Sequence, residues 1–279
     1  MNRIVRLPAL AAALVAITVS VTGCDKLKAR DQLNKGVEAF KAQKYEEAIR
    51  HFQEASKDDP TLPTAKQYLA TALSQNVVPG LTTPDNLKTA QQAIDVFQEV
   101  LQEHPNDINS LKGIASLYYN TDKFNEARDW QKKVLAIDPK DPEAAYTVGA
   151  IDWTQAHQNI LKILNPLGAN DDGNGNLKVI TKKVCPEVQE KNGSLVEEGL
   201  KYLTMAVDNR PGYDEAMQYL NLIYRRKADV DCGNDAAVKE DVAKAMEWTT
   251  KALGTRKENE AKKDKSGGGI QIDSNGGFK

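Results

Sequence analysis

The sequence predicts an all-α protein, a solenoid of about five stacked helix hairpins over residues 29–253. Two observations support this fold class. Leu, Ala, Lys, Gln, Glu and Asp are abundant, while aromatic residues make up only 6% of the 279 residues, a balance that favours helices over sheets. Four prolines also follow amphipathic stretches, and each has the same pattern of small and bulky residues at fixed distances before it.

Residues 1–23 have the features of a secretory signal peptide. Arg3 and Arg6 precede an apolar run over 7–21, and small residues then lead to Cys24. The run is shorter than the roughly 20 residues that a membrane-spanning helix needs. We therefore expect residues 1–23 to direct export and to be removed.

The last residues of this segment, Val21-Thr22-Gly23-Cys24, resemble the lipobox of bacterial lipoproteins, in which an aliphatic residue and two small ones precede a Cys. The resemblance implies that Cys24 carries diacylglycerol, becomes the mature N-terminus and begins a short tether over 24–28. Several acyl chains such as palmitate hold a protein at a membrane. We therefore expect a lipid-anchored protein of the bacterial cell envelope that faces the periplasm, with the choice of membrane left open. A plain signal peptide with a coincidental Cys is the alternative.

The repeat is defined by Pro60, Pro105, Pro139 and Pro211. A small side chain lets two helices approach, a bulky one fills the gap beyond it, and proline cannot continue a helix. Three positions before each proline follow this logic, and Gln131 is the one departure. The residues twelve, eight and five positions before the prolines are Ala48, Ala93, Ala127 and Gly199; Phe52, Phe97, Gln131 and Leu203; and Ala55, Val100, Val134 and Ala206.

This pattern resembles the tetratricopeptide repeat, a pair of helices A and B that spans 34 residues, the spacing from Pro105 to Pro139. The resemblance implies five such units. The fifth is weaker, because Lys257 occupies its proline position. Residues 254–279 are polar and rich in glycine, so we expect a flexible C-terminal tail. The five units cover 29–62, 63–107, 108–141, 142–213 and 214–253.

Repeats 2, 4 and 5 are longer than one unit, with the excess at 76–87, 154–194 and around 228–236. Each excess falls between helices A and B, and all such turns of a solenoid lie along one edge. The insertions therefore form a second working surface there, or they are loops that tolerate growth. Cys185 and Cys232 lie in two neighbouring insertions, and export would permit a disulfide between them. Two separate buried thiols are the alternative.

The segment Asp171-Asp172-Gly173-Asn174-Gly175-Asn176 resembles only the first half of a calcium-binding loop. Leu177 and Lys183 stand where a glycine and a bidentate acid are needed. We therefore expect a tight turn, followed by a short strand over Val179-Ile180-Thr181.

The sequence offers no catalytic constellation. His51, His104 and His157 fall at different repeat positions without a second His or Cys at ligand spacing, so no metal site is predicted. Phosphate loops, nucleophile elbows and HExxH motifs are absent from the sequence. The net charge of −2 also lacks the basic excess of nucleic-acid binding proteins. We predict a protein that is not an enzyme, needs no cofactor and binds no nucleic acid.

The resemblance also implies a concave groove, lined by fixed positions of the A helices, that binds a protein or peptide partner. Aromatic and adaptable polar side chains at these positions suit a bound peptide. The positions of the family's carboxylate clamp hold Leu33 and Val37, which does not favour a chaperone-tail binder. For Tyr146 and Trp153, packing against the 154–194 insertion is the alternative. The predicted groove residues are Gln67, Thr71, Gln75, Asn109, Lys112, Ser116, Tyr119, Asn120, Tyr146, Trp153, Arg225 and Arg226.

Three functional hypotheses follow. The first is a membrane-anchored scaffold or adaptor for protein–protein interaction in the bacterial envelope. A narrower version is a lipoprotein of outer-membrane or pilus biogenesis. The hypothesis from a different class is small-ligand binding in the 154–194 insertion.

Overall fold

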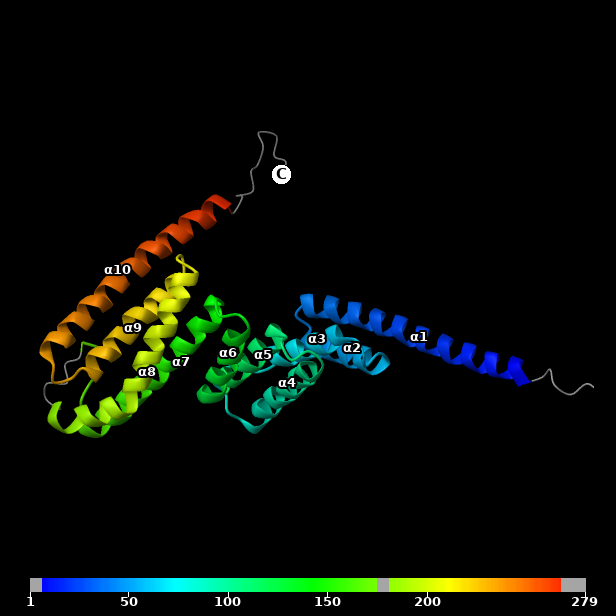
Figure 1. The fold of residues 1–279 in the computed structure, drawn as a ribbon, viewed down its shortest axis with the longest axis horizontal. Coiled ribbons are helices and arrows are strands. Elements are labelled where there is room, and N and C mark those ends of the chain that lie inside the picture. The colour runs from blue at the N-terminus through cyan, green and yellow to red at the C-terminus, as the bar shows by residue number, and fades with distance from the viewer. Residues whose placement is uncertain (1–6, 175–180, 267–279) are drawn as a thin grey trace, which may run out of the picture. The chain divides into compact units, whose positions relative to one another are not determined.

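The computed structural model describes residues 7–174 and 181–266, with side chains over 24–174 and 184–263. Within these residues every regular element is helical (Figure 1). The elements are α1 (Leu7–Lys41), α2 (Tyr45–Asp58), α3 (Pro63–Gln75), α4 (Pro84–Glu103), α5 (Ile108–Asn120), α6 (Phe124–Ile137), α7 (Pro142–Leu164), the 3₁₀ turn η1 (Asn165–Leu167), α8 (Thr181–Asn209), α9 (Asp214–Val230) and α10 (Asp235–Ser266).

The predicted solenoid of helix hairpins is confirmed. Helices α1 and α2, α3 and α4, α7 and α8, and α9 and α10 pack as antiparallel neighbours, and each pair falls in one predicted repeat. The chain forms two compact units, residues 1–130 and 131–279, with the boundary inside α6.

The first unit shows how local sequence fixes these helices. Proline stands in the first turn of α3 and of α4, where its missing N–H costs nothing. Asp107 caps α5, because its Oδ1 accepts a hydrogen bond from the Ser110 backbone N–H at 2.8 Å. The core lies on one side of each helix and includes Phe52 and Phe97, both at the predicted bulky position.

In the second unit, the 154–194 insertion is mainly an extension of two helices. Helix α7 continues to Leu164 and α8 begins at Thr181, so the repeat keeps its hairpin and becomes longer. A second apolar cluster fills this extension, and it includes Ile160, Leu164, Val188 and Cys232. The predicted strand lies mostly outside the described residues, and its last residue, Thr181, starts a helix instead.

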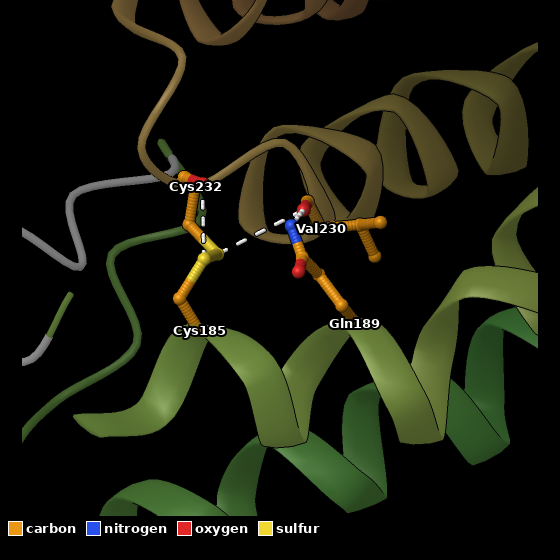
Figure 2. The surroundings of a disulfide bond; sticks show 4 residues. All are labelled: Cys185, Gln189, Val230 and Cys232. Atoms are coloured by element: carbon orange, nitrogen blue, oxygen red, sulfur yellow. Dashed lines mark hydrogen bonds between the residues drawn. A yellow bond between two sulfur atoms is a disulfide. The ribbon is translucent and has the colours of Figure 1, made fainter. Parts of the chain in front are cut away.

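A disulfide joins Cys185 on α8 to Cys232 in the turn after α9, with 5.8 Å between the Cα atoms (Figure 2). Beside it, Gln189 Nε2 donates a hydrogen bond to the Val230 carbonyl oxygen at 3.0 Å. The predicted pairing of these cysteines is therefore present, and it ties the insertions of repeats 4 and 5 together.

The expected flexible tail is wrong for residues 254–266, because α10 continues to Ser266. The buried Asp214, in the first turn of α9, gives the physical reason. Arg256 Nε donates to Asp214 Oδ2 at 2.8 Å, and Asn259 Nδ2 donates to Asp214 Oδ1 at 3.0 Å. These polar contacts attach the end of α10 to α9. The segment has few apolar residues, so its sequence did not predict that it packs. Residues 267–279 lie outside the described part.

At the other end, α1 runs from Leu7 through Cys24 to Lys41, and Cys24 is an exposed free thiol. The side chains of residues 7–23 lie outside the described part, so the signal peptide and the lipidation of Cys24 stay predictions. Within the described residues, no helix has both the length and the apolar character to cross a membrane.

Candidate peptide-binding groove

A groove of about 740 Å³ lies between α3 and α5 in the first unit. Six of the twelve predicted groove residues line it, three from each helix: Gln67, Thr71, Gln75, Asn109, Ser116 and Asn120. The repeat positions therefore bring side chains from two consecutive A helices to one concave surface.

The floor of the groove is apolar. Phe97 reaches it from α4 and is 5% exposed, beside Leu117 of α5. This approach requires a glycine at position 113, since a β-carbon there would lie 2.5 Å from the Phe97 ring. Phe97 falls at the bulky position of the repeat, whereas Gly113 departs from the small-residue positions and could not be found from the repeat spacing.

One wall of the groove comes from the repeat-2 insertion, through Val77 and Pro79. The buried Asn86 shapes this loop: its Oδ1 accepts from the Val78 N–H at 2.8 Å, and its Nδ2 donates to the Leu81 carbonyl at 2.6 Å. The Gly80 N–H, at a φ of 73°, donates to the Asn120 carbonyl oxygen at 2.8 Å. The insertion is thus tied to the end of α5 and helps to build the groove.

The lining residues of the groove carry amide, hydroxyl and aromatic groups and no formal charge. Gln67 is oriented by donating from Nε2 to Asp107 Oδ2 at 3.1 Å. Tyr68 is 38% exposed at the edge, and its ring stacks on Phe52 with 5.4 Å between centroids. Side-chain amides both donate and accept, so such a surface can pair with the main chain of an extended peptide.

Lys112 and Tyr119 were predicted in the groove but are not among the residues that line it. The Tyr119 ring instead packs edge-on against Phe124 at the start of α6, with 5.6 Å between centroids. Position in the repeat placed both residues on α5, but it did not determine which way the side chains turn.

In the second unit, Tyr146 and Trp153 belong to a row of aromatic rings between α7 and α9. Both pack edge-to-face against Tyr219 of α9, with 5.4 Å between centroids in each case. Tyr146 also contacts Tyr213, and Trp153 stacks on His157. Of these four ring contacts, only the one between Trp153 and His157 involves the 154–194 insertion. Packing against the insertion is therefore a minor part of the surroundings of these two rings.

Arg225 and Arg226, the last predicted groove residues, bind the loop that follows η1. Arg226 is 3% exposed and forms ion pairs with Asp171 at 2.8 Å and with Asp229 at 3.2 Å. Arg225 Nη1 donates to the Gly173 carbonyl oxygen at 2.9 Å. Both guanidinium groups therefore already have partners within the chain.

The two acids that share Arg226 have opposite pKa shifts. Burial raises the pKa of Asp229 to about 7, and the charge of Arg226 offsets this only in part. Burial acts on Asp171 in the same direction, but the hydrogen bond and charge of Arg226 bring the pKa of Asp171 below its usual value. Burial also lowers the pKa of His157, as does Arg226. Arg226 thus stabilises the charged form of Asp171 more than that of Asp229.

In the part of the chain that the structure describes, no three His, Cys, Asp or Glu side chains are grouped closely enough to hold a metal ion. Asp171 and Asp229 instead share Arg226 as their counterion.

A family model of the tetratricopeptide repeat matches residues 87–151, from α4 to the first half of α7. The match shows a tetratricopeptide repeat in this part of the chain, and the helix hairpins on both sides of it have the same arrangement.

Two solved structures have the same fold. MamA (residues 41 to the end) from Desulfovibrio magneticus RS-1 is 19% identical, with a TM-score of 0.55 over 83% of this chain and 96% of that one. Another MamA crystal structure is 14% identical, with a TM-score of 0.54 over 87% of this chain and 97% of that one. At these identities the likeness concerns the fold alone.

Curated relatives match over shorter stretches. The DnaJ homolog subfamily C member 3 of Gallus gallus is 30% identical over 104 residues, which are 36% of this chain and 18% of the relative. The Hsp70-Hsp90 organizing protein 2 of Arabidopsis thaliana is 28% identical over 113 residues, 40% of this chain and 18% of the relative. The chain spans less than a fifth of the length of either protein.

Proposed function

We propose that this protein is a non-enzymatic scaffold whose α3–α5 groove binds an extended segment of a partner protein. The observation that carries the proposal is the convergence of six predicted residues, from two consecutive A helices, on one groove. Members of this repeat class bind protein or peptide partners, which supports the same class of function for this chain.

The groove chemistry indicates how such a segment would bind. The amides of Gln75 and Asn109 would pair with its backbone, and an apolar side chain would sit on Phe97 and Leu117. The lining has no charged group, so the contacting part of the partner would be uncharged.

Substitution inside and outside the groove tests this proposal. Ser116 is exposed and lines the groove, so Ser116→Arg would fill it without disturbing the core. Gln98 is also exposed, but it lies on α4 and does not line the groove, so Gln98→Arg is the matched control. In quantitative co-purification from the native host, proteins lost with Ser116→Arg and kept with Gln98→Arg are groove partners. Equal recovery from both variants would refute the proposal.

The scaffold is anchored to a bacterial envelope membrane through lipid on Cys24, facing the periplasm. The lipobox-like residues before Cys24 and the exposed position of its thiol support this part. A role in outer-membrane or pilus biogenesis is a narrower form of the same hypothesis. Labelling with an alkyne fatty acid should modify the native protein and leave Cys24→Ser unmodified. Equal labelling of both, or of neither, would contradict lipidation at Cys24.

The small-ligand alternative for the 154–194 insertion gains no support from its described residues. Apolar side chains pack between the extended parts of α7 and α8. The buried Asn192 bridges the same helices, with Nδ2 donating to the Ala156 carbonyl oxygen at 3.0 Å. This part of the insertion is core.

A further inference from the structure

Three residues of the loop after η1, Asp171, Gly173 and Asn174, bind the two arginines of α9 as a short acidic peptide would. Asp171 supplies a carboxylate, Gly173 a main-chain carbonyl and Asn174 a side-chain oxygen, and all three accept hydrogen bonds from Arg225 or Arg226.

Arg226 contacts both oxygens of Asp171. Arg226 Nη2 donates a hydrogen bond to Asp171 Oδ1 at 2.9 Å, and Arg226 Nη1 lies 2.8 Å from Asp171 Oδ2 in an ion pair without hydrogen-bond geometry. A hydrogen bond between two charged groups is stronger than one between neutral groups. The arrangement favours a carboxylate at this position.

Arg225 completes this site on the same helix. Asn221 Oδ1 orients it by accepting from Nε at 3.0 Å, while Nη1 donates to the Gly173 carbonyl at 2.9 Å and to Asn174 Oδ1 at 2.8 Å. Arg225 therefore recognises the backbone and a neutral side chain two to three residues after the acid. The two guanidinium groups together define a short sequence pattern.

The aromatic row leads directly to this site. His157 Nδ1 lies 3.5 Å from Asp171 Oδ2, and the His157 ring stacks on Trp153, which in turn contacts Tyr219. These rings are partly exposed. A segment bound at the arginines could extend along the rings, which provide contact area at low entropic cost.

Displacing the loop would not leave the buried guanidinium without a counterion. Asp229, 1% exposed, lies 3.2 Å from Arg226 Nη1 and remains when Asp171 leaves. Asp171 is one of the charges that raise the pKa of Asp229, so its departure favours the charged form of Asp229, which then serves as the counterion of Arg226. An exchange of Asp171 for another carboxylate is therefore compatible with the fold.

We propose that Arg225 and Arg226, with the adjoining aromatic row, form a second binding site for an acidic segment of a partner protein, and that residues 171–174 occupy its acid-binding end in the free protein. The proposal commits to an acidic peptide, because the groups already bound there are those of one. It concerns the second unit and does not depend on the α3–α5 groove.

The test measures fluorescence anisotropy with a labelled peptide of residues 168–174, Gly-Ala-Asn-Asp-Asp-Gly-Asn, and a control peptide in which both Asp are Asn. A tethered segment competes at high effective concentration, so the native protein should bind the acidic peptide weakly. The double variant Asp171→Asn/Asn174→Ala should bind the acidic peptide at least about tenfold more tightly than the native protein does. It should not bind the control peptide. Adding Arg225→Gln should abolish the gain.

Asp172→Asn is the matched control, since Asp172 is exposed and its Oδ1 accepts from the Asn174 N–H of its own turn. It should leave peptide affinity unchanged. If the double variant unfolds, Asn174→Ala alone, which keeps the Asp171 ion pair, should still raise the affinity, by a smaller factor. A folded variant that binds neither peptide, or that binds both equally, would overturn the proposal. The contacts of residues 171–174 with the arginines would then serve only to stabilise the fold.

Discussion

Gly149 of α7 lies directly against Leu203 of α8, so closely that a β-carbon at position 149 would be 2.5 Å from the Leu203 Cγ and 3.0 Å from the Gly199 carbonyl oxygen. The equivalent residues of repeat 1, Gly36 and Phe52, meet in the same way. In both repeats a glycine of helix A and the bulky residue eight positions before the proline are therefore two sides of one helix–helix contact.

Gly149→Ala should destabilise the second unit despite the better helix propensity of alanine. The new methyl group meets backbone as well as side chain, and overpacking of this kind costs about 1–3 kcal/mol. Gly193→Ala on α8 is the control, because nothing lies within 4 Å of its β-carbon position, and it should stabilise by up to about 1 kcal/mol. Urea unfolding followed by circular dichroism measures both. Equal effects of the two substitutions would mean that α7 and α8 are not in close contact at Gly149.

Loss of the Cys185–Cys232 disulfide should destabilise the folded protein. The bond closes a loop of 47 residues, for which the chain-entropy model gives about 4 kcal/mol. Thermal unfolding with and without a reductant should therefore show a lower midpoint in the reduced protein. Cys185→Ser/Cys232→Ser should match the reduced protein and be insensitive to reductant. A reductant effect that persists in the double variant would show that another disulfide is responsible.

The free energy of unfolding should fall as pH rises from about 4 to about 7. The pKa of Asp229 is about 7 in the folded state against an ordinary 3.8, so in this interval the folded state binds more protons. Asp241, with a pKa of about 6, acts in the same direction. Asp229→Asn should weaken this slope and stabilise the protein near pH 8 by on the order of 2–4 kcal/mol. Urea unfolding at several pH values tests this, and identical slopes for native and variant protein would contradict it.

Two truncations of α10 should differ in their effect on stability, because only the shorter protein loses the contacts that attach α10 to α9. Ending the chain after residue 254 removes Arg256 and Asn259, the partners of the buried Asp214, and should cost about 1–3 kcal/mol. Ending it after residue 266 keeps both partners and should change little. Chemical unfolding of the two truncated proteins gives the comparison, and equal stability would mean that these polar contacts do not hold α10 to α9.

The helix hairpins could be predicted from the sequence because their boundaries depend on local chemistry. Prolines and small residues recur at fixed spacing, and Phe52 and Phe97 are buried where that spacing puts them. The continuation of α10 could not be predicted, since its attachment through Arg256 and Asn259 depends on Asp214, more than forty residues earlier.

The candidate site could be predicted only in part, because repeat position reports on the backbone and not on contacts between distant segments. Repeat position identifies which residues of α3 and α5 face the concave side, and Gln67 and Asn120 lie there. It does not give side-chain direction, and the Tyr119 ring packs against Phe124 instead of lining this groove. It also does not predict that an inserted loop docks on Arg225. Those features arise from contacts between segments that share no periodic pattern.

Site-specific photocrosslinking in the native host tests the central claim most directly. A photoreactive side chain at Thr71, in the groove, is compared with one at the exposed Gln98 of α4. The account predicts a discrete crosslinked partner from position 71, absent from position 98 and lost when Ser116→Arg is added. Crosslinks that are the same from both positions, or that survive Ser116→Arg, would contradict the claim that the α3–α5 groove binds the partner.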